Sequence, residues 1–197
     1  MFERIPSRQP LNSDNYAYWD NFLSESDINQ LLNAPQWKEQ QQGLVGDVIG
    51  GTDYKQRRSR VAWFVPSEDN KEIWRKITNA IADVNRNFFN FDLSGIDEPA
   101  QLTLYLGSEQ SHYEWHMDSS LQALHVRKLS VSILLSNPSD FEGGELQIQP
   151  TLKEATTVEQ IKGRGWFFPS YTAHRVCPVT KGVRKSLVLW VSGPPFR

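Results

Sequence analysis

The chain of 197 residues has little cysteine, no long apolar run and almost no net charge. Its single cysteine, Cys177, rules out a disulfide within the chain, which fits a reducing compartment. No apolar stretch approaches the roughly 20 residues that a membrane-spanning helix needs. Residues 1–6 also lack the apolar stretch of a secretory signal. We therefore expect a cytoplasmic protein that does not enter the membrane.

The formal net charge is −2, with 21 Lys and Arg against 23 Asp and Glu. Such a balance provides no basic field that would draw the protein to nucleic acid or to an anionic membrane surface. Aromatic residues, in contrast, are abundant: seven Trp, ten Phe and six Tyr, within a hydrophobic share of 39%. This composition supports a packed core and argues against disorder. The length suits a single domain, residues 1–197.

The N-terminal part of the chain, residues 1–99, carries the patterns of two helices. Ser24-Glu25-Ser26-Asp27 has the form of a capping box and predicts a short helix that ends before Pro35. A longer amphipathic helix is predicted over 67–89, with Ser67 as its N-cap. Its apolar positions recur at helical spacing and are Ile73, Trp74, Ile77, Ala80, Ile81, Val84 and Phe88. Between the helices, the glycine-rich stretch 43–51 is either a loop that closes over a substrate or an ordinary connection.

From residue 100 onward the pattern changes to short strands separated by turn residues. Strands are predicted at 101–106, 112–117, 128–136, 144–149, 163–168, 173–177 and 183–192, with turns at 140–144 and 180–182. We therefore expect a jelly-roll catalytic core, 100–197, on an N-terminal helical support that also carries a substrate loop, 1–99.

The last predicted strand has two faces of different character. Leu187, Leu189 and Val191 form an apolar face that needs a cover, and the helix at 67–89 is the candidate. The other face would look into the barrel and consists of Arg184, Ser186, Val188 and Trp190.

His116-Met117-Asp118 and the distant His174 are the candidate metal ligands. In a strand, residues i and i+2 project to the same side, so His116 and Asp118 would share a face, with His174 on a neighbouring strand. Two imidazoles and one carboxylate suit Fe(II) and leave positions open for a cosubstrate and dioxygen. Arg184, ten residues after His174, can clamp a carboxylate with two hydrogen bonds. These residues predict an oxygenase that uses iron and a keto acid with a second carboxylate.

These motifs resemble the core of the iron- and 2-oxoglutarate-dependent dioxygenases, and within that superfamily the prolyl-hydroxylase branch with its small bacterial and viral members. The stretches that carry the resemblance are Tyr105-Leu106-Gly107, Tyr113-Glu114-Trp115-His116-Met117-Asp118, Glu142-Gly143-Gly144-Glu145-Leu146, Phe168-Pro169-Ser170, His174-Arg175-Val176 and Gly182-Val183-Arg184-Lys185-Ser186. Arg57-Arg58-Ser59 resembles, more loosely, an Arg-x-Ser strand of prolyl hydroxylases. The resemblance implies a mostly β fold with helices, built on a double-stranded β-helix. It also implies Fe(II), 2-oxoglutarate and dioxygen, with ascorbate as an accessory reductant.

The resemblance further implies roles for individual residues. His116, Asp118 and His174 would bind iron. Arg184 would hold the far carboxylate of 2-oxoglutarate, where many relatives that act on collagen-like peptides have Lys, and Tyr105 and Ser186 would assist it. Tyr113 resembles a catalytic tyrosine that faces the metal and the substrate. Trp190 resembles a tryptophan that walls the prolyl pocket, and Arg57 would lie near the substrate backbone.

The implied activity is hydroxylation of a prolyl residue in a peptide or protein, with release of succinate and carbon dioxide. Nucleic-acid demethylases of the superfamily carry a second Arg where this chain has Trp190, which counts against a nucleic-acid substrate. Three alternatives stay open: a free amino acid as substrate, a non-prolyl side chain as substrate, or a cupin-like metal protein without redox activity. Core packing is a rival interpretation of Trp190, while His112 and the segment of His125, Arg127 and Lys128 are interpreted as solvent-facing. The oligomeric state is not predicted.

Overall fold

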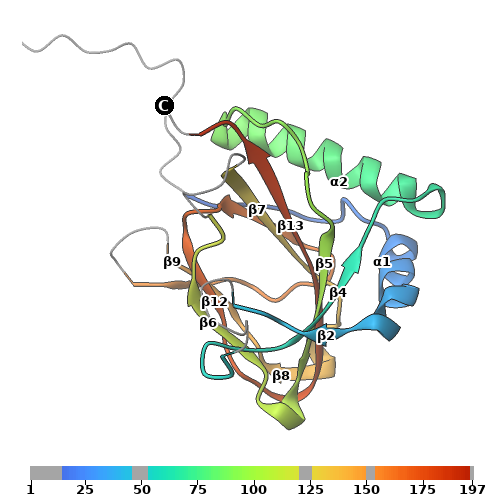
Figure 1. Cartoon of the computed structure of the whole chain (residues 1–197), viewed down its shortest axis with the longest axis vertical. Coiled ribbons are helices and arrows are strands. Elements are labelled where there is room, and N and C mark those ends of the chain that lie inside the picture. Colours follow the sequence, from blue (N-terminus) through green and yellow to red (C-terminus); the bar gives the residue numbers. More distant parts are fainter. Residues whose placement is uncertain (1–14, 46–52, 120–125, 150–153, 196–197) are drawn as a thin grey trace, which may run out of the picture.

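The computed structural model describes residues 15–45, 53–119, 126–149 and 154–195. Two antiparallel sheets form the body of the molecule, and helices α1 (Glu25–Leu32) and α2 (Lys71–Val84) lie outside one of them (Figure 1). This is the double-stranded β-helix that the sequence predicts. Within the described ranges, no helix is long and apolar enough to cross a membrane.

The larger sheet carries the helices and includes strands from both halves of the chain. Its order is β1 (Ala17–Trp19), β11 (Gly165–Pro169), β7 (Val126–Leu134), β13 (Val179–Gly193), β5 (Ala100–Leu106), β4 (Arg60–Phe64) and β2 (Gln41–Gln42). The short strand β8 (Phe141–Gly143) pairs with β13 off this path. Residues before 100 therefore contribute strands as well as helices to the fold.

The smaller sheet holds most of the residues that the sequence singles out for metal binding. Its order is β10 (Thr156–Thr157), β9 (Leu146–Gln149), β12 (Ala173–Val176), β6 (His112–His116) and β3 (Arg57–Arg58). Strand β12 lies between β9 and β6 and pairs antiparallel with both. Its pairing with β6 places His174 opposite His116.

The predicted helices are present, with one correction at the end of the longer one. In the capping box of α1, Asp27 N donates to Ser24 Oγ at 3.2 Å, and Ser24 N donates to Asp27 Oδ2 at 2.7 Å. The predicted helix 67–89 divides into a 3-10 turn (Glu68–Asn70), α2 and a π turn (Asn85–Phe89). A π turn inserts an extra residue and rotates the helix face. Phe88, predicted on the apolar face, is consequently exposed.

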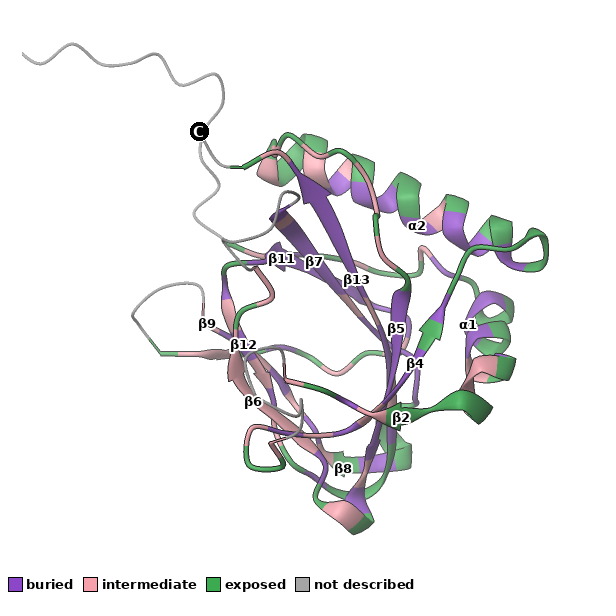
Figure 2. Ribbon diagram, viewed as in Figure 1, coloured by how far each residue is buried: buried purple, intermediate pink, exposed green. Residues whose placement is uncertain are grey.

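The main core lies between the larger sheet and the helices. Leu187, Leu189 and Val191 of β13 pack there with the buried face of α2, which confirms the predicted alternation of the last strand. Figure 2 shows α2 buried on the side that faces the sheet and exposed on the other. A second apolar cluster lies between the two sheets and includes Tyr105, Leu146, Phe168 and Val176.

Two predicted turns are wrong. Residues Phe141–Gly143 form β8, and 180–182 lie inside β13, which is a 15-residue strand that begins at Val179. Gly182 has φ 72°, and a Cβ there would lie 2.0 Å from the carbonyl oxygen of Asp140. The pairing of β8 with β13 shifts register between Val179 and Lys181. The glycine thus marks an irregularity within a strand and a close approach of two backbones, not a reversal of the chain.

Candidate metal centre and cavity

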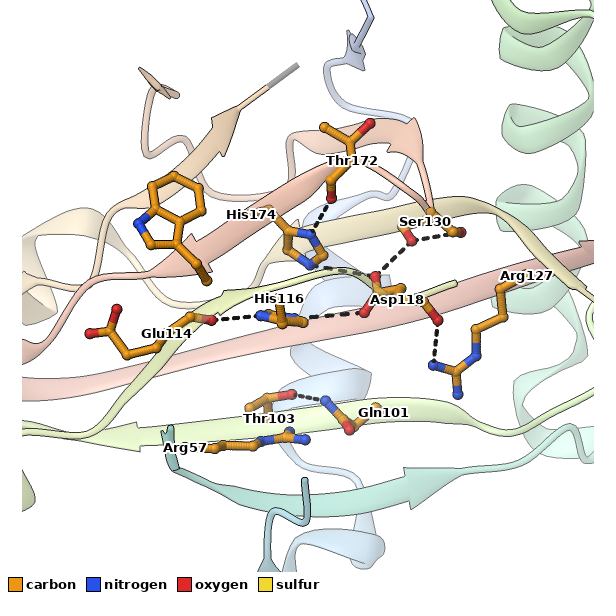
Figure 3. A network of polar contacts seen from close by, with 12 residues as sticks. Arg57, Gln101, Thr103, Glu114, His116, Asp118, Arg127, Ser130, Thr172 and His174 are labelled. Atoms are coloured by element: carbon orange, nitrogen blue, oxygen red, sulfur yellow. Dashed lines mark hydrogen bonds and ion pairs between the residues drawn. The ribbon is translucent and has the colours of Figure 1, made fainter. Parts of the chain in front are cut away.

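The structure brings His116, Asp118 and His174 together at one end of the smaller sheet. One ligand atom from each lies within 4.8 Å of the others. Asp118 Oδ1 is 3.7 Å from His116 Nε2, and Asp118 Oδ2 is 3.4 Å from His174 Nε2 (Figure 3). Two imidazole nitrogens and one carboxylate that converge in this way form a set that suits a transition metal such as Fe(II).

Backbone carbonyls fix the orientation of both histidine rings. His116 Nδ1 donates to the carbonyl oxygen of Glu114 at 2.8 Å, and His174 Nδ1 donates to that of Thr172 at 3.0 Å. Because a carbonyl can only accept, the proton of each neutral ring lies on Nδ1. The lone pair on each Nε2 therefore faces Asp118, as a metal ligand requires.

Asp118 follows the end of β6 and is held by Ser130 of β7 and by Ser170, which follows β11. Its backbone N–H donates to the carbonyl oxygen of Ser170 at 2.9 Å. Ser130 Oγ donates to Asp118 Oδ2 at 2.7 Å and lies 2.9 Å from Ser170 Oγ. The His-x-Asp spacing thus places both ligands on one side, although Asp118 itself lies outside the strand.

Burial and mutual contact determine the charges of this cluster. Burial, followed by the neighbouring His174, lowers the pKa of His116 to about 3. Burial alone would raise the pKa of Asp118, but His174, His116 and the Ser130 hydroxyl outweigh it and lower that pKa. A neutral imidazole beside an ionised carboxylate is the protonation state in which both can bind a metal.

A three-layer stack lies against the cluster. The ring centroids of Tyr113 and His116 are 3.5 Å apart, and the two rings are nearly parallel. The guanidinium of Arg57 forms the third layer, with its Cζ 4.5 Å from the Tyr113 ring centroid. Burial raises the pKa of Tyr113, so its phenol stays protonated. Arg57 is buried and donates to Ser59 Oγ and to the carbonyl oxygen of Leu44. Its Nη2 has no hydrogen-bond partner in the described part of the chain.

Arg184 is a buried cation on the inner face of β13. Its side chain lies over the ring of Tyr105, and its Nη1 donates to Ser186 Oγ at 3.3 Å. Among the described residues, no carboxylate forms an ion pair with it, and its Nε has no partner. Burial lowers the pKa of Arg184. An unpaired guanidinium in such a place is costly unless an anion binds to it.

A cavity of about 280 Å³ lies beside the metal-ligand cluster. Its lining includes the metal-ligand cluster with Tyr105, Tyr113, Arg57, Ser186 and Trp190. Arg184 lines a small recess that shares Ser132 and Leu146 with the cavity. A wider open groove between α2 and residues 90–99 contains none of these ligands, so the smaller cavity is where the chemistry can take place.

Trp190 faces this cavity and not the helical layer. It is 6% exposed, and its neighbours Leu189 and Val191 pack in the main core instead. The guanidinium of Arg127 lies over its ring, with Cζ 3.9 Å from the ring centroid.

The sequence assigns no role in the site to Arg127, Ser130 or Ser170, although Ser170 lies in one of the stretches that carry the resemblance. Arg127 was expected at the solvated surface, but it lies in β7 and lines the cavity, and Lys128 beside it is buried. The alternation of β7 gives a signal for an inward Ser130, since Ser130 and Ser132 share one face of the strand. Nothing in the local sequence places Ser170 beside it.

The other residues considered lie elsewhere or outside the description. Both ring nitrogens of His112 contact backbone oxygens, of Gln110 and Lys55, away from the cluster. Lys185 is on the outer face of β13, over the ring of Trp37. His125 and residues 46–52 of the glycine-rich stretch lie outside the described residues.

Comparisons with known proteins agree with this geometry. Residues 100–192 match the family model of the 2OG-Fe(II) oxygenase superfamily. The chain is 38% identical over 187 residues to a PKHD-type hydroxylase from Psychrobacter sp. (strain PRwf-1), which covers 87% of this chain and 67% of that protein.

Two solved structures have the same fold. One is a prolyl hydroxylase from Trichoplax adhaerens in complex with a hypoxia-inducible factor peptide, with a TM-score of 0.72, 22% identity, and coverage of 91% of this chain and 84% of that one. The other is a viral collagen prolyl hydroxylase from Paramecium bursaria Chlorella virus-1 in a 2OG complex. Its TM-score is 0.68 and its identity 25%, with coverage of 92% and 97%.

Proposed function

The chain belongs to the 2OG-Fe(II) oxygenase superfamily, and from this premise we propose that it hydroxylates a prolyl residue in a peptide or protein. Fe(II), 2-oxoglutarate and dioxygen are the cofactor and cosubstrates of this superfamily. In the proposed reaction, 2-oxoglutarate is converted to succinate and carbon dioxide while one oxygen atom enters the substrate.

His116, Asp118 and His174 are the proposed iron ligands. The two Nε2 lone pairs and the Asp118 carboxylate face one another, which fits Fe(II) bound through one face. Bound iron supplies the redox chemistry of the reaction. The chain's own contribution is to hold the His116 imidazole neutral and the Asp118 carboxylate ionised.

The observation that carries the proposal is the unpaired guanidinium of Arg184. It lies in a recess that adjoins the cavity of the metal-ligand cluster, with Ser186 and Tyr105 beside it. A dicarboxylic keto acid could bind the cluster at one end and Arg184 at the other, through a two-pronged contact. We propose this role for Arg184, with Ser186 and Tyr105 as supporting residues.

The proposed substrate is suggested by the aromatic walls of the cavity. Tyr113, the proposed catalytic tyrosine, is stacked beside the cluster, and Trp190 lines the same space. A proline ring is apolar and rigid, so such walls can orient it at little entropic cost. The Trichoplax relative binds a peptide, which supports a peptide or protein partner for this chain.

One observation favours a second candidate. Arg57 has an unpaired Nη2 in the cavity wall. This donor suits a peptide carbonyl, but it also suits the carboxylate of a free amino acid. A free amino acid therefore stays as the alternative substrate class.

A turnover assay tests the proposal. Purified protein with Fe(II), ascorbate and 2-oxoglutarate should form succinate, and proline-containing peptides should gain one oxygen atom by mass spectrometry. Asp118→Ala should be inactive in the same assay. If free amino acids stimulate succinate formation and no proline peptide does, the prolyl substrate is wrong. If no 2-oxoglutarate is consumed under any condition, the oxygenase activity itself is refuted.

A further inference from the structure

We propose that Glu98 is a positioning residue for the part of the cavity wall that Trp190 and Arg127 form. It holds Arg127 against Trp190 and keeps this wall from attracting acidic substrates. The part of this inference that concerns substrates rests on the proposed function. The positioning of Trp190 does not, and it can be measured without turnover.

Glu98 and Arg127 form a two-pronged ion pair at the edge of the cavity. Arg127 Nε donates to Glu98 Oε1 at 2.6 Å, and Arg127 Nη2 donates to Glu98 Oε2. The third nitrogen, Nη1, points toward the carbonyl oxygen of Asp118 at 3.5 Å (Figure 3). The planar guanidinium also lies over the Trp190 ring. Every edge of the group is thus engaged, and one face is stacked.

The fold brings Glu98 to this place by contacts far apart in the sequence. Ser94 N donates to the carbonyl oxygen of Ser192 at 2.8 Å, and Ser192 N donates to that of Gly95 at 2.8 Å. Ser192 is also the register partner of Arg127 between β13 and β7. The segment before β5 is therefore tied to the end of the strand that carries Trp190, which puts Glu98 beside Arg127.

The two charged residues have different access to the substrate. Arg127 lines the cavity, whereas Glu98 lines the outer groove beside α2. Glu98 therefore acts through Arg127 and does not contact the reacting groups. Its carboxylate neutralises the guanidinium, so the wall offers a substrate an aromatic ring and a compensated charge. Without that carboxylate, the same wall would carry a free cation next to Trp190.

The size of the effect follows from the exposure of the pair. The side chains of Arg127 and Glu98 are 31% and 29% exposed, so solvent screens them in part. Charge pairs of this kind have modest effects, and we expect a change of about tenfold in preference for an acidic over a neutral substrate.

The experiment compares the full-length protein with Glu98→Gln and Glu98→Gln/Arg127→Gln. Glu72→Gln is the matched control, because Glu72 also pairs with an arginine, Arg75, but on the exposed face of α2. The probes are blocked peptides that contain Ala-Pro-Gly, Asp-Pro-Gly or Ala-Pro-Asp. The measured quantity is the ratio of kcat/KM for each acidic peptide to that for the neutral one.

Glu98→Gln should raise this ratio about tenfold, chiefly through KM, and the double variant should return it to the wild-type value. Glu72→Gln should match the wild type. An unchanged ratio in Glu98→Gln would overturn the role of Glu98 in specificity.

Fluorine NMR tests positioning independently of turnover. In protein labelled with 5-fluorotryptophan, the Trp190 resonance is assigned by its absence in Trp190→Phe. Glu98→Gln should shift and broaden that resonance, and Glu72→Gln should not. If the resonance is unaltered in Glu98→Gln, the positioning role is refuted. If it moves but wild-type protein hydroxylates none of the peptides, positioning is supported and the prolyl substrate fails.

Discussion

Replacement of Arg184 by Met should have opposite effects on stability and on cosubstrate binding. Arg184 is 3% exposed, and it forms no ion pair within the described ranges. It lines the recess together with apolar residues that include Leu134 and Val158. Met preserves most of that packing and removes the buried charge.

The expected magnitudes follow from this burial. Exchange of buried charged groups for apolar residues of similar volume is often stabilising by about 1–4 kcal/mol. For a chain of this size each kcal/mol corresponds to about 2–4 °C in Tm. Loss of a buried charge partner costs about 3–5 kcal/mol, so the affinity for 2-oxoglutarate should fall by about two to three orders of magnitude.

Two assays measure these effects. Denaturant unfolding without 2-oxoglutarate gives the change in the free energy of unfolding, and calorimetric titration of the metal-loaded protein gives the dissociation constant of 2-oxoglutarate. Lys185→Met is the control, since Lys185 is the next residue along β13 but lies on its outer face. It should leave the 2-oxoglutarate affinity at the wild-type value.

If Arg184→Met lowered the free energy of unfolding by several kcal/mol, Arg184 would be a structural residue. If the 2-oxoglutarate affinity were unchanged, another cation would hold the far carboxylate, and Arg57 would be the next candidate in the cavity.

Three further predictions concern the cluster, the wall and a salt bridge near α1. Asp118→Ala should abolish stoichiometric Fe(II) binding, measured by metal analysis after dialysis, and retention of iron would remove Asp118 from the ligand set. Trp190→Ala should abolish peptide hydroxylation while Fe(II) binding persists, because the three proposed ligands stay in place; unchanged peptide kcat/KM would show that Trp190 is packing alone. Asp27→Ala should cost about 1 kcal/mol at neutral pH, because it removes the N3 half of the capping box and the ion pair with Lys76. Burial would raise the pKa of Asp27, but hydrogen bonds from Lys76 and Ser24 lower it overall. A carboxyl with a lowered folded-state pKa stabilises above its unfolded pKa of 3.8 and loses this contribution as the pH falls through the folded pKa. The difference between wild type and variant in urea melts should therefore shrink below pH 3.8, and a constant difference would contradict the reasoning.

The features that were predictable from sequence are those encoded in local patterns. The alternation of 184–191 identifies which side of β13 meets the helices and which side meets the cavity. The capping box predicts where α1 begins. The His-x-Asp spacing, with a distal His174, identifies three residues that the fold brings within 4.8 Å of one another. In each case the periodicity of one element carries the information.

The features that were not predictable depend on contacts between distant segments. Arg127 looks like a surface residue next to Lys128, and only the pairing of β7 with β13 places it over Trp190. Gly143 and Gly182 resemble turn residues, but they allow β8 and β13 to approach closely. A glycine reports the backbone conformation that it permits and not the tertiary contact that requires it.

The hydrogen bonds of the two histidine rings have a consequence for how this site can change over generations. Each ring donates to the backbone carbonyl of the residue two positions earlier in the sequence, His116 to Glu114 and His174 to Thr172. A main-chain acceptor survives any substitution at positions 114 and 172 that preserves the backbone conformation, so no neighbouring side chain has to co-vary with either imidazole. The backbone conformation therefore determines the tautomer of both rings. Substitutions of the residues that line the cavity can therefore change its substrate specificity while the geometry of the two histidines stays constant. Single substitutions that leave both rings in place are enough for such a change.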